Sequence, residues 1–258
     1  MGPLLFLAAC AHPPGDNNTR VSRPGAGTIV GITVRRDTDP ALVDGAFAAL
    51  AAWEARYSEW NPGSITSRAT TSPQDLDAEG LALFRYAGWL HDASGGAFDI
   101  GWRGATWSVR GDQLTASGPL DLGGLLKGFL ADRAADSLRA AGVGDFAVDV
   151  GGDVVVEGEA RPGSGGWPVD VAVGGTIRTV TVIEALSTSS QEQQPGHVVD
   201  ARDGKAASTL AGVYVTARTG LEADGLATAV LASGGGIEPP PGARVCVVGA
   251  EGGDTCGE

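Results

Sequence analysis

A lysine in a glycine-rich turn is the first feature of this sequence that could do chemistry. The chain has only two lysines, and Lys127 follows Gly123 and Gly124 at the start of an apolar helical pattern. Glycines let the main chain approach a ligand closely, and the free N–H groups of a helix start favour an anion. The ammonium adds a point charge that suits phosphate. Because the spacing of a Walker A loop is absent, the motif alone allows a phosphate site or an exposed lysine beside a tight turn.

A second candidate site is an acidic residue and a hydroxyl four residues apart. Asp224 and Thr228 share one face near the start of a predicted helix. Both offer oxygen atoms, which suit a hard cation such as Mg²⁺. An acidic side chain in the first helical turn is also favourable to the helix dipole, so this pair alone does not establish a metal site.

A histidine and several polar turns complete the candidate chemistry. His197 precedes Asp200, and a histidine near a carboxylate can act as a general base or can be structural. The segment VDVGGD places Asp149 in a predicted strand and Asp153 in a Gly-Gly turn, where an aspartate is ordinary. None of these motifs identifies a function by itself.

The composition limits the classes of function. The chain has 258 residues, 43% of them apolar, which is enough for a sizeable core. Its formal net charge of −13 argues against nucleic acid as a partner, because binding to the phosphate backbone needs clustered lysine and arginine. No apolar run reaches 18 residues, so the sequence predicts no membrane-spanning helix.

The elements that must position these residues follow from periodicity. Residues 28–34 alternate as a strand, and Asp39-Pro40 predicts the start of a helix that runs to about residue 57. Further helices are predicted at 77–92, with Leu81, Phe84 and Gly88 inward, after the Gly123-Gly124 turn, and at 222–233. The buried stripe predicted for the helix that contains Lys127 comprises Leu126, Phe129, Leu130, Ala134 and Leu138. Hairpins at 146–158 and 169–185 complete an α+β fold: one domain with antiparallel sheets covered by helices.

The N-terminus predicts export. Leu7-Ala8-Ala9-Cys10 resembles the lipobox of bacterial lipoproteins, in which the cysteine carries the lipid. The polar, Pro- and Gly-rich residues that follow read as a flexible tether, so we divide the chain into a signal and tether at 1–24 and a domain at 25–258. Because no basic segment precedes it, the apolar stretch can alternatively be an N-terminal segment that is not a targeting signal.

The remaining two cysteines agree with export. Cys246 lies in a predicted strand, and Cys256 follows the turn AEGGD, so the two could meet across a hairpin. A disulfide would be allowed outside the cytoplasm, and two unpaired thiols are the alternative.

The motifs occur in the same order as those of a known protein family. LDLGGLLKG, AVDVGGDV, STSS, HVVDARDGK and ADGLATAVLASG follow one another at intervals similar to those of the FAD:protein FMN transferase (ApbE) family. The family patterns are DLGGIAKG, VDLGGD, TSG, HIIDPxTG and DALATAL. The resemblance extends upstream to GTIVGITV, YSEWNPGSITSR and GGAFDIG and covers about residues 25–235. It implies an ApbE-like, T-fold-like architecture, and many members of the family are lipoproteins.

The resemblance also implies a reaction and roles for residues. The family transfers FMN from FAD to a threonine hydroxyl of a target protein and releases AMP, with a divalent metal, usually Mg²⁺. The implied metal ligands are Asp224, Thr228 and a backbone carbonyl near Gly124, and the implied catalytic residues are His197, as general base, and Lys127. The residues implied to contact FAD are Asp99, Gly123, Gly124, Lys127, Asp149, Ser189 and His197.

Targets in the family include subunits of sodium-pumping NADH:quinone oxidoreductases (Nqr) and Rnf-type complexes, together with other extracytoplasmic flavoproteins. The resemblance therefore implies an extracytoplasmic protein, anchored through Cys10 to the periplasmic face of the inner membrane or to the cell surface.

The sequence departs from the family around the flavin. The methionine of the family's MGT motif is Ala26, the proline of HIIDP is Ala201, and the segment after Ile100 is short. Two alternatives therefore stay open: an FAD pyrophosphatase that makes AMP and FMN with water, and a lipid-anchored flavin-binding protein without catalysis.

Overall fold

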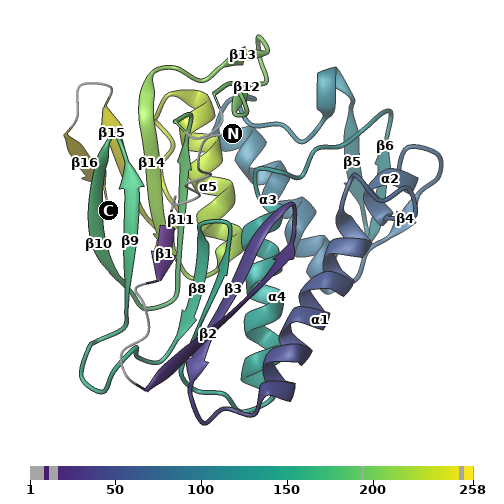
Figure 1. The fold of residues 1–258 in the computed structure, drawn as a ribbon. Helices are drawn as coiled ribbons and strands as arrows, with labels where there is room; N and C mark the ends of the chain where they lie inside the picture. Colours follow the sequence, from purple (N-terminus) through teal and green to yellow (C-terminus); the bar gives the residue numbers. More distant parts are fainter. Residues whose placement is uncertain (1–8, 12–16, 193–194, 250–252, 258) are drawn as a thin grey trace, which may run out of the picture.

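The computed structural model describes residues 9–11, 17–192, 195–249 and 253–257. Its centre is an eight-stranded antiparallel sheet in the order β16-β15-β14-β11-β8-β7-β3-β2 (Figure 1). The strands are β2 (Asn18–Gly25), β3 (Thr28–Arg35), β7 (Phe146–Val150), β8 (Asp153–Glu157), β11 (Ala185–Ser190), β14 (Leu210–Ala217), β15 (Arg244–Gly249) and β16 (Asp254–Gly257). The predicted α+β fold with antiparallel sheets is confirmed.

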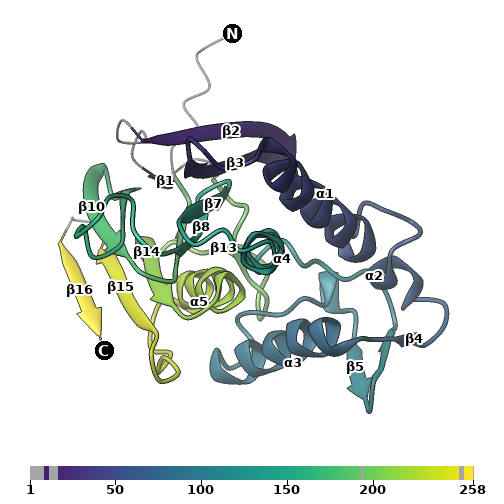
Figure 2. The ribbon, with the colours of Figure 1, turned by 90° about the horizontal axis from the view of Figure 1, so that it is seen from below.

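Helices cover one face of this sheet. Helix α4 packs on β7 and β8, and α5 packs on β11 and β14. In Figure 2, α4 and α5 lie side by side against the sheet, with α1 outside α4 and α3 outside α5. The helices are α1 (Pro40–Tyr57), α2 (Ile65–Arg68), α3 (Ala78–Ala93), α4 (Leu126–Ala140) and α5 (Gly220–Ser233), with a short 3₁₀ turn, η1, at Trp102–Gly104. The candidate residues of α4 and α5 therefore belong to adjacent helices.

Smaller sheets surround this arrangement. β1 (Ala9–Ala11), β9 (Trp167–Val173) and β10 (Thr176–Val182) form a sheet that shares a second apolar core with the main sheet. β4 (Gln74–Asp75), β5 (Trp107–Arg110) and β6 (Gln113–Ala116) form another sheet beyond α2, and β12 (Val199–Asp200) pairs with β13 (Lys205–Ala206). The helices lie on one side of the main sheet and β9 on the other, so both of its faces contribute to a core.

Local signals determine where the helices begin and end. Asp39 caps α1 by accepting the N–H of Ala41 at 2.9 Å, and Pro40 occupies the first helical position, as predicted. Helix α5 ends at Gly234, whose φ of 77° is the left-handed conformation that glycine adopts without strain. The buried stripe predicted for α4 is confirmed at all five positions.

Two sequence interpretations are wrong in detail. The tether predicted before residue 25 instead contains β2, which pairs with β3 over eight residues and contributes an edge strand to the main sheet. Because one edge of such a strand faces solvent, its composition is polar and resembles that of a flexible linker. Helix α3 buries Leu83, Phe84, Ala87 and Leu90, whereas Leu81 and Gly88 are half-buried, because the stripe lies about one residue away from the predicted one.

The rest of the N-terminal prediction is untested. Residues 1–8 and 12–16 lie outside the described residues, so the signal segment does too. The main chain of Cys10 is described and lies in β1, opposite Asp170 of β9. The lipid anchor stays a prediction.

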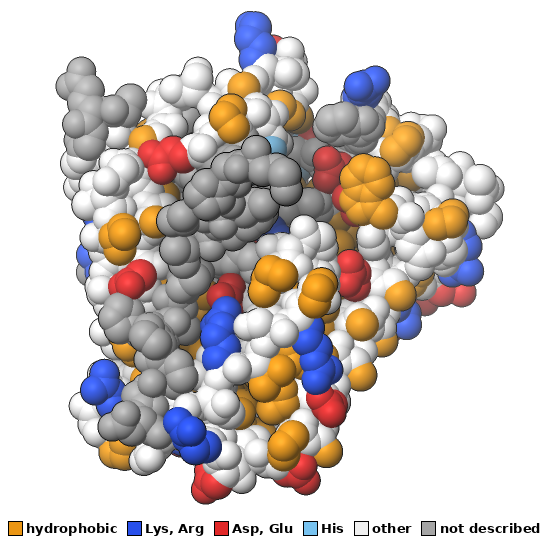
Figure 3. All heavy atoms as spheres, viewed as in Figure 1, with side chains coloured by type: hydrophobic (Ala, Val, Ile, Leu, Met, Phe, Trp, Pro, Cys, Tyr) orange, Lys and Arg blue, Asp and Glu red, His pale blue; other side chains and the backbone are white. Residues whose placement is uncertain are grey.

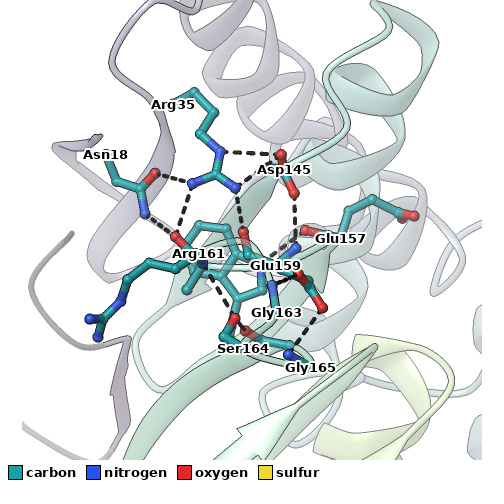
Figure 4. A network of polar contacts seen from close by, with 12 residues as sticks. Asn18, Arg35, Asp145, Glu157, Glu159, Arg161, Gly163, Ser164 and Gly165 are labelled. Atoms are coloured by element: carbon teal, nitrogen blue, oxygen red, sulfur yellow. Dashed lines mark hydrogen bonds and ion pairs between the residues drawn. The ribbon is translucent and has the colours of Figure 1, made fainter. Parts of the chain in front are cut away.

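An arginine network joins the start of the main sheet to the loop between β8 and β9. The Arg35 guanidinium donates to Asp145 at 3.1 Å, to the Asn18 side chain at 3.1 Å and to the main-chain oxygen of Ala160 at 2.9 Å (Figure 4). Asp145 also accepts the N–H of Glu159 at 2.9 Å. The contacts of Arg35 with Asp145 and Ala160 join residues that are more than 100 positions apart in the sequence, so they fix β3 to the loop between β8 and β9.

A disulfide closes the other edge of the sheet. Cys246 and Cys256 are direct partners on β15 and β16, and they are bonded to each other, so the predicted pairing is confirmed.

None of the described helices is long and apolar enough to cross a bilayer. On the face shown in Figure 3, basic side chains lie apart from one another between polar and apolar surface.

Candidate active site

The strongest candidate site is a lysine held between two buried carboxylates. Lys127 lies in the first turn of α4, with its Nζ 2.6 Å from Oδ2 of Asp153 and 3.5 Å from Oδ1 of Asp224. Asp153 opens β8 and Asp224 lies in α5, so three elements meet at one ammonium. The carboxylate side chains are 2% exposed, whereas Lys127 is 33% exposed. The lysine is therefore the part of the cluster that solvent or a ligand can reach.

Burial shapes the protonation of this cluster. Burial, and after it the nearby Asp224, raise the pKa of Asp153, Lys127 partly offsets both, and the resulting pKa is about 7. Burial alone would lower the pKa of Lys127, but the two carboxylates outweigh that effect and hold its pKa above the ordinary value. Lys127 therefore stays an ammonium. Ser187, on β11, donates its hydroxyl to Oδ1 of Asp153 and so fixes the carboxylate that holds the lysine.

Asp224 connects the two helices. Its Oδ2 accepts the main-chain N–H of Gly128 at 2.9 Å, while its Oδ1 faces Lys127. The residue before α4 provides no side-chain cap, so Asp224 from α5 satisfies one of the N–H groups at the start of α4. Two carboxylates face one ammonium in this buried cluster, so a bound cation would balance the excess of acidic groups.

The turn before α4 packs directly on the face of α5 that carries Thr228. A Cβ atom at Gly124 would lie 2.8 Å from Cγ2 of Thr228 and 3.0 Å from the ring of Phe98, so only glycine fits there. The Thr228 hydroxyl lies 3.2 Å from Oγ of Ser189, at the end of β11. Gly123 lies in the same turn and donates its N–H to Asp121 at 2.8 Å.

The structure thus brings together most of the candidate residues: Gly123, Gly124, Lys127, Ser189, Asp224 and Thr228. Their oxygen donors are the carboxylate of Asp224 and the hydroxyls of Thr228 and Ser189. Mg²⁺ prefers a small number of carboxylates together with substrate phosphates over a cage made by protein alone. Within the described ranges no group of three His, Cys, Asp or Glu side chains could hold a metal. A site of one carboxylate, hydroxyl oxygens and substrate oxygen fits Mg²⁺.

Asp99 lies beside the cluster with its carboxylate occupied. Its Oδ1 accepts the N–H of Gly101 at 2.8 Å and the indole N–H of Trp107 at 3.0 Å. The neighbouring Phe98 contacts the Gly124 turn as described above. Asp99 therefore shapes the segment that borders the turn, and its predicted contact with flavin is untested.

Asp149 lies on the other face of the main sheet. Its carboxylate pairs with Arg20 of β2 at 2.7 Å and accepts the N–H of Gly152 at 3.0 Å. Its neighbours Val148 and Val150 point into the helix-covered core, so alternation along β7 turns Asp149 away from Lys127. The structure does not bring Asp149 into the cluster.

His197 lies on the exposed segment that leads from β11 to β12. Residues 193–194 of this segment are outside the described part of the chain, and His197 itself is exposed. The main-chain N–H of Ala201 donates to the oxygen of Ala97 at 2.9 Å, which ties β12 to the segment next to Phe98. The segment of His197 is therefore at the same end of the sheet as Ser189, and the predicted role as general base is untested.

Sequence reasoning missed the structural importance of Asp153. It reads as an ordinary turn residue, yet it is the first residue of a strand and is 1% exposed. The available signal was the fully apolar run Val154–Val156 directly after it, because a carboxylate next to such a run needs a buried partner. Ser187, which donates to Asp153 and so helps to hold the cluster in place, carries no comparable signal.

Comparison with known proteins agrees with this geometry. A model of the ApbE family matches residues 26–112 and 106–237, most of the chain. A search of curated proteins found no significant match. The fold is similar to that of the flavin transferase ApbE from Vibrio cholerae, with a TM-score of 0.79 at 19% identity over 95% of this chain and 97% of the other. It is also similar to the flavinyl transferase ApbE of Pseudomonas stutzeri in its apo form, with a TM-score of 0.76 at 21% identity over 93% and 94%. The ApbE protein of Thermotoga maritima gives a TM-score of 0.78 at 18% identity over 93% and 97%.

Proposed function

Because the chain belongs to the ApbE family, we propose that it is a flavin transferase that moves FMN from FAD onto a threonine of a target protein. The threonine Oγ bonds to the phosphorus of the FMN half, the bond from that phosphorus to the AMP phosphate breaks, and AMP leaves. The threonine hydroxyl gives up one proton. The observation that carries the proposal is the convergence of Lys127, Asp224 and Thr228 beside the Gly124 turn.

The residues of the cluster supply binding and charge. The Lys127 ammonium, held by Asp153 and partly exposed, would bind the pyrophosphate of FAD and would stabilise the charge that develops during transfer. Asp224, Thr228 and the main chain near Gly124 would hold Mg²⁺. When bound, the metal would neutralise and polarise the pyrophosphate.

His197 is the proposed acceptor of the threonine proton. Its exposure suits a residue that must meet a hydroxyl delivered by another protein, because the acceptor arrives from solvent. An exposed base also suits water as the acceptor, which is why hydrolysis of FAD to FMN and AMP is the second candidate.

The proposed location is outside the cytoplasm, with the chain anchored to the bacterial membrane through a lipid on Cys10. The disulfide between Cys246 and Cys256 supports export, since disulfides persist in oxidising compartments. The proposed partners are extracytoplasmic flavoproteins that carry an acceptor threonine, of the Nqr and Rnf type or others.

The test measures two products together. The purified full chain is incubated with FAD and Mg²⁺, with and without a flavoprotein that carries an acceptor threonine, and AMP release and acceptor mass are recorded. A mass gain of one FMN less one water that depends on the acceptor, and that Asp224→Asn and His197→Ala abolish, supports transfer. Asp136→Asn serves as the control, since Asp136 is an exposed residue of α4.

The other outcomes separate the alternatives. AMP released at the same rate without the acceptor indicates a pyrophosphatase. Bound FAD without AMP in either reaction indicates a flavin-binding protein and contradicts catalysis.

A further inference from the structure

Helices α4 and α5 cap each other through two carboxylates. Asp132 of α4 is 6% exposed, and it accepts the N–H of Gly220 at 2.7 Å and the N–H of Leu221 at 2.9 Å. In return, Asp224 of α5 accepts the N–H of Gly128 in α4 at 2.9 Å. Each helix therefore satisfies main-chain N–H groups at the start of the other.

The two main chains touch at this crossing. A Cβ atom at Gly128 would lie 2.0 Å from the oxygen of Gly220, and one at Gly220 would lie 2.4 Å from the oxygen of Gly128. A side chain at either glycine would collide with main-chain atoms, which do not move aside as a flexible side chain does. The separation of the helices is thus determined by direct contact, and Lys127 and Asp224 lie next to that contact.

The first three main-chain N–H groups of α5 all donate to acceptors within the protein. Asp132 accepts from the first two helical N–H groups, and the Thr219 hydroxyl accepts from the third, that of Glu222, at 3.1 Å. A helix start of this kind could otherwise bind an anion. Here it is instead a support for the residues one and two turns further along α5, Asp224 and Thr228.

Only a carboxylate satisfies both donors at this position. The two oxygens of Asp132 each accept one N–H, and the negative charge lies at the positive end of the α5 dipole. An asparagine would turn its NH₂ group toward one of the two N–H donors and leave that donor unsatisfied. The side chain does not reach Lys127 or Asp224 through any described hydrogen bond, so its influence on them passes through the helices.

We propose that Asp132 is a positioning residue for the flavin-transfer site: it holds the start of α5 on α4 and so sets the distance between the Lys127 ammonium and the oxygens of Asp224 and Thr228. The inference rests on the proposed function, because the residues it positions are the proposed metal and pyrophosphate ligands. It adds a residue that does not itself touch the substrate.

The test compares Asp132→Asn with Thr219→Ala. Both remove capping from the same helix end, but Thr219→Ala leaves the link between α4 and α5 intact. FAD binding is measured by titration calorimetry with and without Mg²⁺, together with thermal unfolding and the dependence of AMP release on Mg²⁺. We expect Asp132→Asn to weaken the Mg²⁺-dependent part of FAD binding by about tenfold or more, as the loss of one charge-assisted hydrogen bond predicts. Thr219→Ala should lower thermal stability alone.

Three results overturn the proposal. The first is an equal loss of Mg²⁺-dependent binding in both variants, which would mean that general helix stability is responsible. The second is an Asp132→Asn variant that loses stability but keeps normal Mg²⁺ dependence of binding and of turnover. The third applies if Asp132→Asn does not fold: amide hydrogen exchange of Gly220 and Leu221 in the unaltered chain should be as slow as in the core, and fast exchange at these amides contradicts the proposed link.

The binding measurement also separates this inference from the proposed function. If the unaltered chain shows Mg²⁺-dependent FAD binding but no transfer to the acceptor, the transfer reaction fails and the comparison of variants still reports on Asp132. If the unaltered chain shows no Mg²⁺-dependent FAD binding, both proposals fail.

Discussion

Replacing Lys127 with methionine tests the electrostatics of the candidate site. Methionine keeps an unbranched side chain but removes the ammonium that lies 2.6 Å from Asp153 and 3.5 Å from Asp224. Removing one partner from a buried ion pair costs about 3–5 kcal/mol. Because Lys127 is 33% exposed, water replaces part of the lost interaction, and we expect a loss of about 2–3 kcal/mol in the free energy of unfolding near neutral pH.

The loss should depend on pH in a defined direction. The pKa of Asp153 is already raised to about 7, because burial and Asp224 outweigh the lysine, and without the ammonium this pKa rises further. An unfolded aspartate titrates near pH 3.9, so between that pH and the folded pKa the folded chain holds a proton that the unfolded chain lacks. Stability therefore falls as pH rises through this window. The free energy of unfolding of Lys127→Met should fall more steeply with pH than that of the unaltered chain. The loss caused by the substitution should be small near pH 5.5 and complete near pH 8.5.

Chemical denaturation followed by tryptophan fluorescence measures this effect at the two pH values, since the chain contains six tryptophans. Lys205→Met is the control, because Lys205 is 80% exposed and pairs with Asp203 at the surface. An equal loss at both pH values, or a larger loss at the lower one, would refute the electrostatic reasoning. A Lys127→Met chain as stable as the unaltered one at high pH would do so as well.

Three further predictions follow from single contacts. Gly128→Ala places a Cβ atom 2.0 Å from a main-chain oxygen of α5. We therefore expect the free energy of unfolding, measured by thermal unfolding, to fall by about 1–3 kcal/mol, and Mg²⁺-dependent FAD binding to weaken. An unchanged melting temperature would contradict the described crossing of the helices. Thr228→Val removes the hydroxyl beside Ser189 while keeping the shape, and it should reduce Mg²⁺ affinity with a change in stability below about 1.5 kcal/mol; normal Mg²⁺ dependence would remove Thr228 from the site. Reduction of the Cys246–Cys256 disulfide should lower the free energy of unfolding by roughly 2–3 kcal/mol, as the short closed loop predicts. FAD binding should not change, since β16 lies at the sheet edge beyond β14 and β15. Loss of binding on reduction would show that this edge supports the site.

Much of the local structure could be predicted from the sequence alone. The cap and proline at Asp39-Pro40, the buried stripe of α4 and the hairpin that joins Cys246 to Cys256 follow from neighbouring residues and short spacings. Such features depend on local main-chain geometry, which a few adjacent side chains determine. The order of the motifs likewise indicates the family, and it identifies Lys127, Asp224 and Thr228 as candidate site residues.

The environment of those residues was decided only by tertiary structure. Asp153 and Asp132 became important because of partners 26 and 88 residues away, and no local pattern encodes such distances. The same holds for β2, whose polar residues become a strand only when β3 offers its edge.

The direction of Asp149 has a similar cause. Alternation along β7 puts Asp149 and Val148 on opposite faces, but nothing in the strand says which face the helices will cover. The sequence by itself therefore determined the chemical groups, the helices and most of the strands. The packing of α4 on α5, through two glycines and two carboxylates, decided which of those groups meet, because burial and hydrogen bonding act between elements that are distant in the chain.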